Sequence, residues 1–272
     1  MNPLIYYDEL PLWSAPFGLI LLDTIRMKPG MNILDIGSGS GFPMFEIAGR
    51  MGSSCSVYGL DPSEDSRKMI RAKMKANPIP NISIIKGFAE EMPFPDGFFH
   101  LIVSNNGINN VTDQQKVFSE CYRVSDPDVQ MVFTVNLPDT MVEFYEIFEA
   151  TLSEMRLTAE IEKMHRHIYE KRKPVDELKE LIRSGGFTLH SLIVDDFKIR
   201  AMDGTAFFNH HLIRKAFMNP WKSILPENMV ENVFTRLKER LKIKAEEHSG
   251  LSFSVPYACF DCRKKTTIFP CQ

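Results

Sequence analysis

The sequence predicts an α/β fold, in which a doubly wound parallel sheet carries helices on both faces and is extended by helical insertions. Short apolar runs alternate with amphipathic helical patterns through the first half of the 272 residues, which is the order of right-handed βαβ units. A glycine-rich turn, NILDIGSGSGFP at residues 32–43, follows the first apolar run, at the kind of junction where open α/β sheets bind ligands. Long helical stretches interrupt the alternation after residue 138.

The strands and helices of the first half can be assigned in order. Strands are expected at NILDIG, SVYGLD, ISIIKG, FHLIVSNN and VQMVFTVN, each a short apolar run. Helical spacing indicates helices at FPMFEIAGRM, SEDSRKMIRAKMKAN and TDQQKVFSECYRV. Ser63 is the expected N-cap of the second of these helices, because its hydroxyl can accept a hydrogen bond from the first turn.

The second half contains two further strands and two helical insertions. The helix VDELKELIRS should end at Gly185 and Gly186, and strands are expected at TLHSLIVDDFKI and LSFSVPYACFDC. The expected organisation is an N-terminal lid segment (1–27), a core (28–138), a helical cap insertion (139–173), a continuation of the core (174–200), a second helical insertion (201–248) and a C-terminal strand and tail of the core (249–272).

Composition excludes several classes of function. A net charge of −3 argues against a protein that binds nucleic acid by neutralising phosphates. The first residues lack a basic region and the longest apolar run is too short to span a bilayer, so we expect no membrane insertion. Five cysteines do not form a disulfide framework, and Cys259 and Cys262 fall three apart on an expected strand, where they point to opposite faces. We therefore expect a cytoplasmic protein without a metal site.

The glycine-rich turn is typical of a backbone that a ligand approaches closely. A dinucleotide site has the spacing G-x-G-x-x-G, whereas here Phe42 stands at the third glycine position and the spacing is G-x-G-x-G. A carboxylate at Asp35 would repel a pyrophosphate and suits a cationic ligand. A second acid, Asp61, ends the next strand, where a carboxylate can accept hydrogen bonds from ribose hydroxyls.

These motifs together resemble the class I S-adenosylmethionine-dependent methyltransferases, in the group that includes ubiquinone and menaquinone biosynthesis methylases. ILDIGSGSG and VYGLDPS resemble the first two family motifs, IIKGFAEEMPFPDGFFHLIVSNNGINNV the third and fourth, and FSECYRVSDPDVQMVF the following helix and strand. The resemblance is continuous over residues 28–138. It implies a Rossmann-like sheet of seven strands, mostly parallel with the last strand antiparallel.

The resemblance also implies a binding site for S-adenosylmethionine, with S-adenosylhomocysteine as product. Asp35 would fix the methionine end by orienting the loop, and Asp61 would bind the ribose hydroxyls. The other implied contacts are Gly37, Ser38 and Gly39 along methionine and ribose, Pro62 and Ala89 at the adenine, Asn105 beneath the methionine moiety, and Tyr7 closing over the cofactor. Phe88 stands where the family commonly has an aspartate that contacts the adenine amino group, so that contact is either missing or supplied by Glu90 or by the Ala89 backbone.

The leading interpretation is an enzyme that methylates a small molecule, with an apolar or aromatic acceptor suggested by the aromatic residues of the expected caps. His210 and His211 are candidate general bases, because histidine titrates near neutrality. Two alternatives remain: a protein that binds the cofactor without transferring the methyl group, and a nicotinamide-dependent oxidoreductase. The sequence leaves a homodimer open and does not identify the acceptor.

Overall fold

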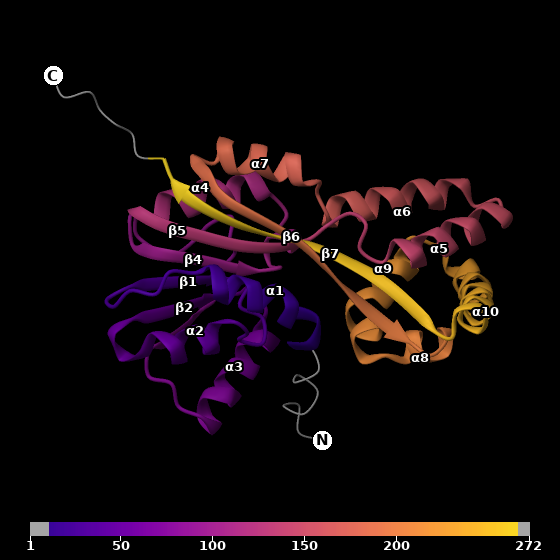
Figure 1. The fold of residues 1–272 in the computed structure, drawn as a ribbon, viewed down its shortest axis with the longest axis horizontal. Coiled ribbons are helices and arrows are strands. Elements are labelled where there is room, and N and C mark those ends of the chain that lie inside the picture. Colours follow the sequence, from indigo (N-terminus) through magenta and orange to yellow (C-terminus); the bar gives the residue numbers. More distant parts are fainter. Residues whose placement is uncertain (1–10, 266–272) are drawn as a thin grey trace. The chain divides into compact units, whose positions relative to one another are not determined.

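The computed structural model describes residues 11–265 and divides the chain into two compact units. The first unit comprises residues up to 135 together with 174–194 and 257 onward, and the second comprises 136–173 and 195–256. Two long strands, β6 (Phe187–Ala201) and β7 (Leu251–Lys264), contribute to both units. Figure 1 labels the helices and strands of both units.

The first unit contains the alternating elements that the sequence predicts. In chain order they are α1 (Pro11–Thr24), β1 (Asn32–Ile36), α2 (Met44–Met51), η2 (Gly52–Ser54), β2 (Ser56–Leu60), α3 (Glu64–Ala76), β3 (Ile82–Ile85), β4 (Phe99–Asn105), η3 (Ile108–Asn110), α4 (Gln114–Val124), β5 (Ser125–Asn136) and α7 (Val175–Ser184). The N-cap prediction is confirmed, since the Ser63 hydroxyl accepts the Ser66 N–H at 3.2 Å.

The seven strands form a sheet in the order β3-β2-β1-β4-β5-β7-β6, which confirms the predicted fold class. The pairs β1–β2, β1–β4, β2–β3 and β4–β5 are parallel. The last strand, β7, runs antiparallel: its end lies at the start of β5, where the Lys264 ammonium donates to the Ser125 carbonyl, while Phe260 stacks on Phe133 further along β5. The carboxyl ends of the parallel strands therefore meet at one edge.

Helices pack on both faces of this sheet because the strand residues alternate between two apolar layers. On one face, Leu21 of α1, Ile47 of α2 and Ile70 of α3 share a buried cluster with Ile33 and Val103. On the other face, Phe118 of α4 meets Phe133 edge-to-face at 5.5 Å. Gly185 lies so close to Phe118 that a Cβ there would come within 2.5 Å of that side chain, so the end of α7 packs tightly on α4.

The second unit is mainly helical. It contains α5 (Val142–Glu154), α6 (Thr158–Lys171), α8 (Gly204–Asn209), the π-helical turn η4 (Ile213–Phe217), α9 (Met218–Ser223), η5 (Glu227–Met229) and α10 (Val230–His248). Its core is aromatic: Phe144 stacks on the fully buried Trp221 at 4.2 Å, and the Trp221 indole N–H donates to the Tyr145 hydroxyl at 3.0 Å. The two helical stretches expected as separate insertions thus share one hydrophobic core.

Candidate cofactor site

A cavity of about 590 Å³ opens in the first unit at the carboxyl ends of β1, β2 and β4. Its walls are the loop after β1, the start of the segment after β2, the turn at residues 87–90 and the turn at residues 105–112, together with Trp13 and Ser14 of α1. This volume is typical of a pocket for one small molecule. The sequence motifs thus converge on a single cavity.

The backbone of the glycine-rich loop forms the floor of this cavity. Gly37, Gly39 and Gly41 all have left-handed φ angles, of 72°, 52° and 99°, which residues with a Cβ adopt at a cost. A Cβ at Gly41 would come within 2.2 Å of the Phe45 ring, whereas a Cβ at Gly39 would meet only the Gly37 carbonyl oxygen at 3.8 Å. Gly39 therefore leaves open space that a ligand can occupy.

Several N–H groups of this loop are already hydrogen-bonded within the protein. Gly37 and Ser38 donate to the Leu60 carbonyl at 2.9 and 3.4 Å, and Gly41 donates to the Ser38 carbonyl at 2.7 Å. Pro43, which precedes α2, has no N–H to offer. A phosphate-binding loop works by directing its N–H groups at the ligand, so this loop is not suited to a pyrophosphate.

Asp61 places a carboxylate at the edge of the loop. Its Oδ2 accepts the Gly39 N–H at 2.9 Å and its Oδ1 accepts the Ser63 N–H at 2.8 Å, so the side chain is held in one orientation between β2 and α3. A carboxylate has about four acceptor positions, and two remain for hydroxyl groups of a ligand. The Arg67 guanidinium donates to the Asp61 main-chain carbonyl at 2.8 Å and fixes the backbone of the same turn.

Asp35 lies beneath the loop and does not line the cavity. Neither of its carboxylate oxygens has a hydrogen-bond partner among the described residues. Burial and, second, the negative charge of Asp61 raise the pKa of Asp35 to about 8, against an opposing effect of the Met44 backbone N–H. The Asp35 carboxyl is therefore mostly protonated at neutral pH, and the Asp61 carboxylate supplies the negative charge beside the loop.

Two side chains, the Asn105 amide and the Glu90 carboxylate, connect segments of the cavity wall. The Asn105 amide donates to the Ser14 carbonyl of α1 at 3.1 Å and accepts from the Thr134 hydroxyl at 2.9 Å. The Glu90 carboxylate accepts the Thr112 N–H at 2.8 Å. Both residues line the cavity, and in this structure each also connects two segments of its wall.

The remaining predicted contacts from residues 37–90 lie in the same cavity. Pro62, Ala89 and the 64 % exposed Phe88 form one end of it. Ser38 also lines the cavity, and its buried hydroxyl oxygen has no partner within the described part of the chain. The Phe88 ring is the large exposed apolar side chain at this end, and it takes the place of an acid in the family pattern.

Other predicted residues lie elsewhere. His210 and His211 belong to the second unit, where His210 is exposed and His211 half-buried, and neither lines the cavity. Their role as general bases stays a prediction. Tyr7 lies outside the described residues.

The sequence analysis missed several lining residues. Trp13, Ser14 and the turn from Asn106 to Thr112 all contribute to the wall. Gly107 was the available signal: a Cβ there would lie 2.6 Å from the Ile36 carbonyl oxygen, so a glycine just after a strand marks the close approach of β4's end to the loop. Trp13 belongs to the expected N-terminal lid segment, but its place in the wall of the cofactor cavity was not predicted, because that place depends on how α1 packs.

No ligand set for a metal and no membrane-spanning helix occur in the described chain. Residues 11–265 bring together no group of three or more His, Cys, Asp or Glu side chains that could hold a metal ion. None of the helices within that range is both long and apolar enough to cross a bilayer. Cys259 and Cys262 are buried in β7, and burial raises the pKa of Cys259 to about 11, so this thiol stays protonated.

The observed donors and acceptors fit S-adenosylmethionine. Asp61 provides acceptors for ribose hydroxyls, and the open face of Gly39 gives space along the loop. The N–H groups of Gly37, Ser38 and Gly41 already donate to protein carbonyls, which disfavours a dinucleotide. The Asp61 carboxylate, rather than the mostly neutral Asp35, also suits a ligand of positive charge.

Comparison with known proteins gives methyltransferases as relatives of this chain. Curated relatives include a demethylmenaquinone methyltransferase of Listeria monocytogenes, 32 % identical over 150 residues, or 55 % of this chain and 62 % of that protein. Another, from Anoxybacillus flavithermus, is 25 % identical over 74 % of this chain and 87 % of its own length. This chain thus spans less than two thirds of the first curated relatives that it matches.

Solved structures share the fold. A methyltransferase of undemonstrated activity from Bacillus halodurans superposes with a TM-score of 0.61 over 92 % of this chain and 99 % of its own, at 18 % identity. Another is the Haemonchus contortus phosphoethanolamine N-methyltransferase 2, in complex with phosphomonomethylethanolamine and S-adenosylhomocysteine. It superposes with a TM-score of 0.55 over 92 % of this chain and 52 % of its own, at 20 % identity. Residues 27–202 match the family described as "Methyltransferase domain", and the chain therefore belongs to the class I S-adenosylmethionine-dependent methyltransferases.

Proposed function

We propose that this protein transfers the methyl group of S-adenosylmethionine to a small-molecule acceptor that is apolar or aromatic. The observation that carries the proposal is the Asp61 carboxylate, which two backbone N–H groups orient at the rim of the glycine loop. The curated relatives named demethylmenaquinone methyltransferases support a quinone-type acceptor.

Some residues of the chain would bind S-adenosylmethionine, and others would position the loop that it contacts. Bound S-adenosylmethionine supplies an electrophilic methyl group on a sulfonium centre. Asp61 would accept hydrogen bonds from the ribose hydroxyls, and the Ala89 backbone would meet the adenine. Gly37, Ser38 and Gly39 would line the ligand along the loop. Asp35 would support that loop from beneath as a neutral, buried carboxyl.

Methyl transfer depends largely on alignment of the acceptor and on exclusion of water. Asn105 contributes to alignment because it ties the α1 backbone at Ser14 to the end of β4 and to Thr134 of β5. This contact sets the position of the cavity wall that carries Trp13 and Ser14. A histidine base from His210 or His211 is a further proposal, tested by the dependence of transfer on pH in the two alanine variants.

The test is transfer of labelled methyl from S-adenosylmethionine to a fractionated metabolite extract. We expect the full chain to label a small molecule that partitions into organic solvent, and Asp61→Ala to lose most of this labelling. The Asp113→Ala variant is the matched control, because Asp113 caps α4 through the Lys116 N–H and does not line the cavity.

Two results would contradict the proposal in different ways. Tight binding of S-adenosylhomocysteine without label in any fraction would indicate a binding protein that does not transfer. Co-purification of a nicotinamide dinucleotide, detected by mass spectrometry, would indicate an oxidoreductase instead.

A further inference from the structure

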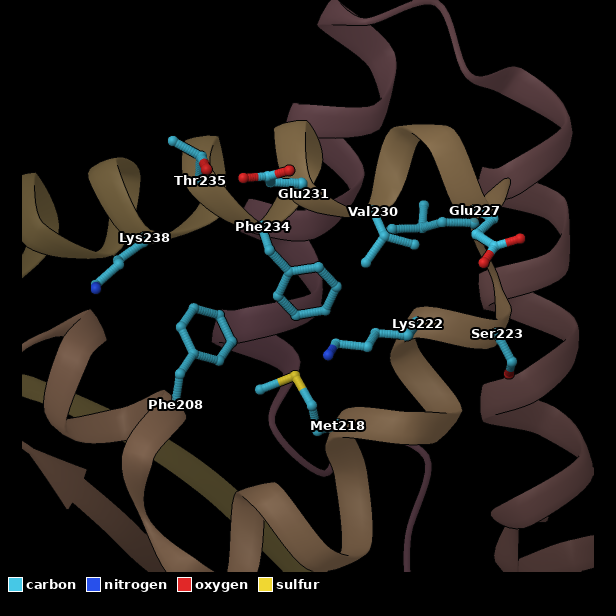
Figure 2. A pocket seen from close by; sticks show the side chains of 11 residues that line it. Phe208, Met218, Lys222, Ser223, Glu227, Val230, Glu231, Phe234, Thr235 and Lys238 are labelled. Carbon is cyan, nitrogen blue, oxygen red and sulfur yellow. The ribbon is translucent and has the colours of Figure 1, made fainter.

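The second unit contains a cavity of about 850 Å³ of its own, lined by residues 208–238 only (Figure 2). Its walls come from three helical segments: the end of α8, the region of α9, and η5 with the first half of α10. Five apolar side chains line it, namely Phe208, Met218, Leu225, Val230 and Phe234. No predicted cofactor contact is among these residues.

The aromatic wall of this cavity is backed by the core of the unit. The Phe208 and Phe234 rings meet at 5.5 Å in an edge-to-face arrangement. Phe208 contacts the buried Phe144 ring at 6.1 Å, and Phe234 contacts the buried Phe148 ring at 6.5 Å. Because both rings rest on buried neighbours, the apolar wall is largely formed before any ligand binds.

One cation points into the space that these rings enclose. Figure 2 shows the Lys222 ammonium directed between Phe234 and Met218, while the carboxylates of Glu227 and Glu231 point away from it. Within residues 11–265, Lys222 forms no ion pair or hydrogen bond through its ammonium. The Lys222 ammonium therefore lies beside an apolar surface and has no anionic partner within the described residues.

We propose that this cavity binds a small amphiphilic anion, with an aromatic or aliphatic body against Phe208 and Phe234 and a single carboxylate, sulfonate or phosphate group on Lys222. An ion pair to a lysine at an apolar surface is stronger than one in open water, because fewer water molecules compete for the charges. The apolar body adds hydrophobic burial that an inorganic anion lacks. Apolar surface of this kind, bordered by charged side chains, is typical of ligand-binding grooves.

This proposal does not rest on the proposed methyl transfer and can be tested without S-adenosylmethionine. The full chain is titrated with 8-anilinonaphthalene-1-sulfonate, followed by fluorescence, and the dye is then displaced with dodecanoate or with dodecyltrimethylammonium below their micelle concentrations. We expect saturable binding of one dye molecule per chain and displacement by dodecanoate. The cationic amphiphile of equal chain length should displace it at least about tenfold less well, the effect of one charge-assisted contact.

Lys222→Met keeps the apolar stem and removes the charge. It should weaken dodecanoate binding about tenfold. Lys215→Met is the matched control, because Lys215 is also exposed in the same helical region but does not line the cavity, and it should bind as the wild type does. Lys222 is exposed, so its substitution should leave the thermal unfolding temperature unchanged.

Four outcomes would overturn the proposal. Equal dodecanoate affinity in Lys222→Met and the wild type would show that the Lys222 charge does not contribute to binding. Equal displacement of the dye by the two amphiphiles would show non-specific binding to an apolar surface. A dimer in sedimentation velocity that excludes the dye would assign this face to a second copy of the chain. Vesicles of anionic lipid that bind the wild type and displace the dye, where dodecanoate does not, would assign it to a lipid surface.

Discussion

The cofactor cavity and the cavity around Lys222 are built in different ways. In the first unit the floor is main chain, several of its N–H groups donate to β2 and to Asp61, and the carboxylates of Asp61 and Glu90 line the cavity. In the second unit apolar side chains from separate helices make much of the wall, and the Lys222 ammonium points into the space. A site made of backbone at strand ends comes from residues contiguous in sequence, whereas a site made of helix side chains is assembled from residues that packing brings together.

The largest effect is expected at Asp35, beneath the loop of the cofactor cavity. The pKa of the Asp35 carboxyl is about 8 in the folded state and about 3.9 in the unfolded state. Between these two pH values the folded protein keeps a proton on Asp35 that the unfolded chain has released. Stability should therefore fall as pH rises from about 4 to 8, by on the order of 5 kcal/mol in total, and level off above pH 8. In Asp35→Asn this loss should be absent.

Urea denaturation of both proteins at half-unit steps from pH 4.5 to 8.5 measures the difference between their free energies of unfolding. The difference should change steadily in favour of Asp35→Asn as pH rises. A difference that stays constant with pH would show that Asp35 titrates normally and that the loop does not rest on a neutral carboxyl.

Gly39→Val tests whether a ligand lies on the loop backbone. The side chain would project into open space, so we expect S-adenosylhomocysteine affinity to fall more than about 100-fold, a loss of about 3 kcal/mol. Gly30→Val is the matched control, because Gly30 also has a left-handed φ of 75°, nothing lies within 4 Å of its added Cβ, and it does not line the cavity.

Both valine variants should lose about 1–2 kcal/mol of stability from the same backbone strain. Calorimetric titration separates this common cost from the binding loss specific to Gly39. Equal affinities in the two variants would mean that the ligand does not pass over Gly39.

Asp61→Ala should weaken S-adenosylmethionine binding by about 1.5–3 kcal/mol, the scale of hydrogen bonds to a charged group. The substitution also removes the acceptors of the Gly39 and Ser63 N–H groups, so the loop is no longer held to the end of β2 by these two hydrogen bonds. Isothermal titration of Asp61→Ala is compared with that of Asp113→Ala, which loses a helix cap of about 1 kcal/mol at a residue that does not line the cavity. The comparison checks that affinity rather than stability has changed. Unchanged affinity in Asp61→Ala would remove the ribose assignment.

Tyr145→Phe tests the core of the second unit. The Tyr145 hydroxyl accepts from the Trp221 indole N–H at 3.0 Å and lies 3.4 Å from the Arg172 guanidinium. Its removal leaves buried donors unsatisfied, so we expect about 1–2 kcal/mol of destabilisation, with S-adenosylhomocysteine affinity at 25 °C unchanged. Tyr169→Phe, at a 49 % exposed position, should change the stability by less than about 0.5 kcal/mol. A drop in cofactor affinity in Tyr145→Phe would contradict the separation of the two sites.

Much of the fold and part of the first site could be predicted because they depend on local pattern. Alternating strands and helices, the Ser63 cap and the stop at Gly185 follow from residue types within a few positions of one another. The cluster of Gly37, Gly39 and Asp61 was predictable because strand ends meet at one edge of a parallel sheet. The place of Trp13 in the cavity wall was not, although Trp13 lies in the expected lid segment 1–27, because that place depends on how α1 packs on the sheet.

The sequence by itself determined the fold class, the family and the loop that floors the cofactor cavity, because these depend on periodicity and on glycines whose left-handed angles are a local requirement. Only the tertiary structure decided the charge state of Asp35 and the single aromatic core shared by the two helical stretches. The same is true of the cavity that surrounds Lys222. Each depends on burial and on neighbours distant in the chain, and the free energies of desolvation and packing arise only when those neighbours are in place.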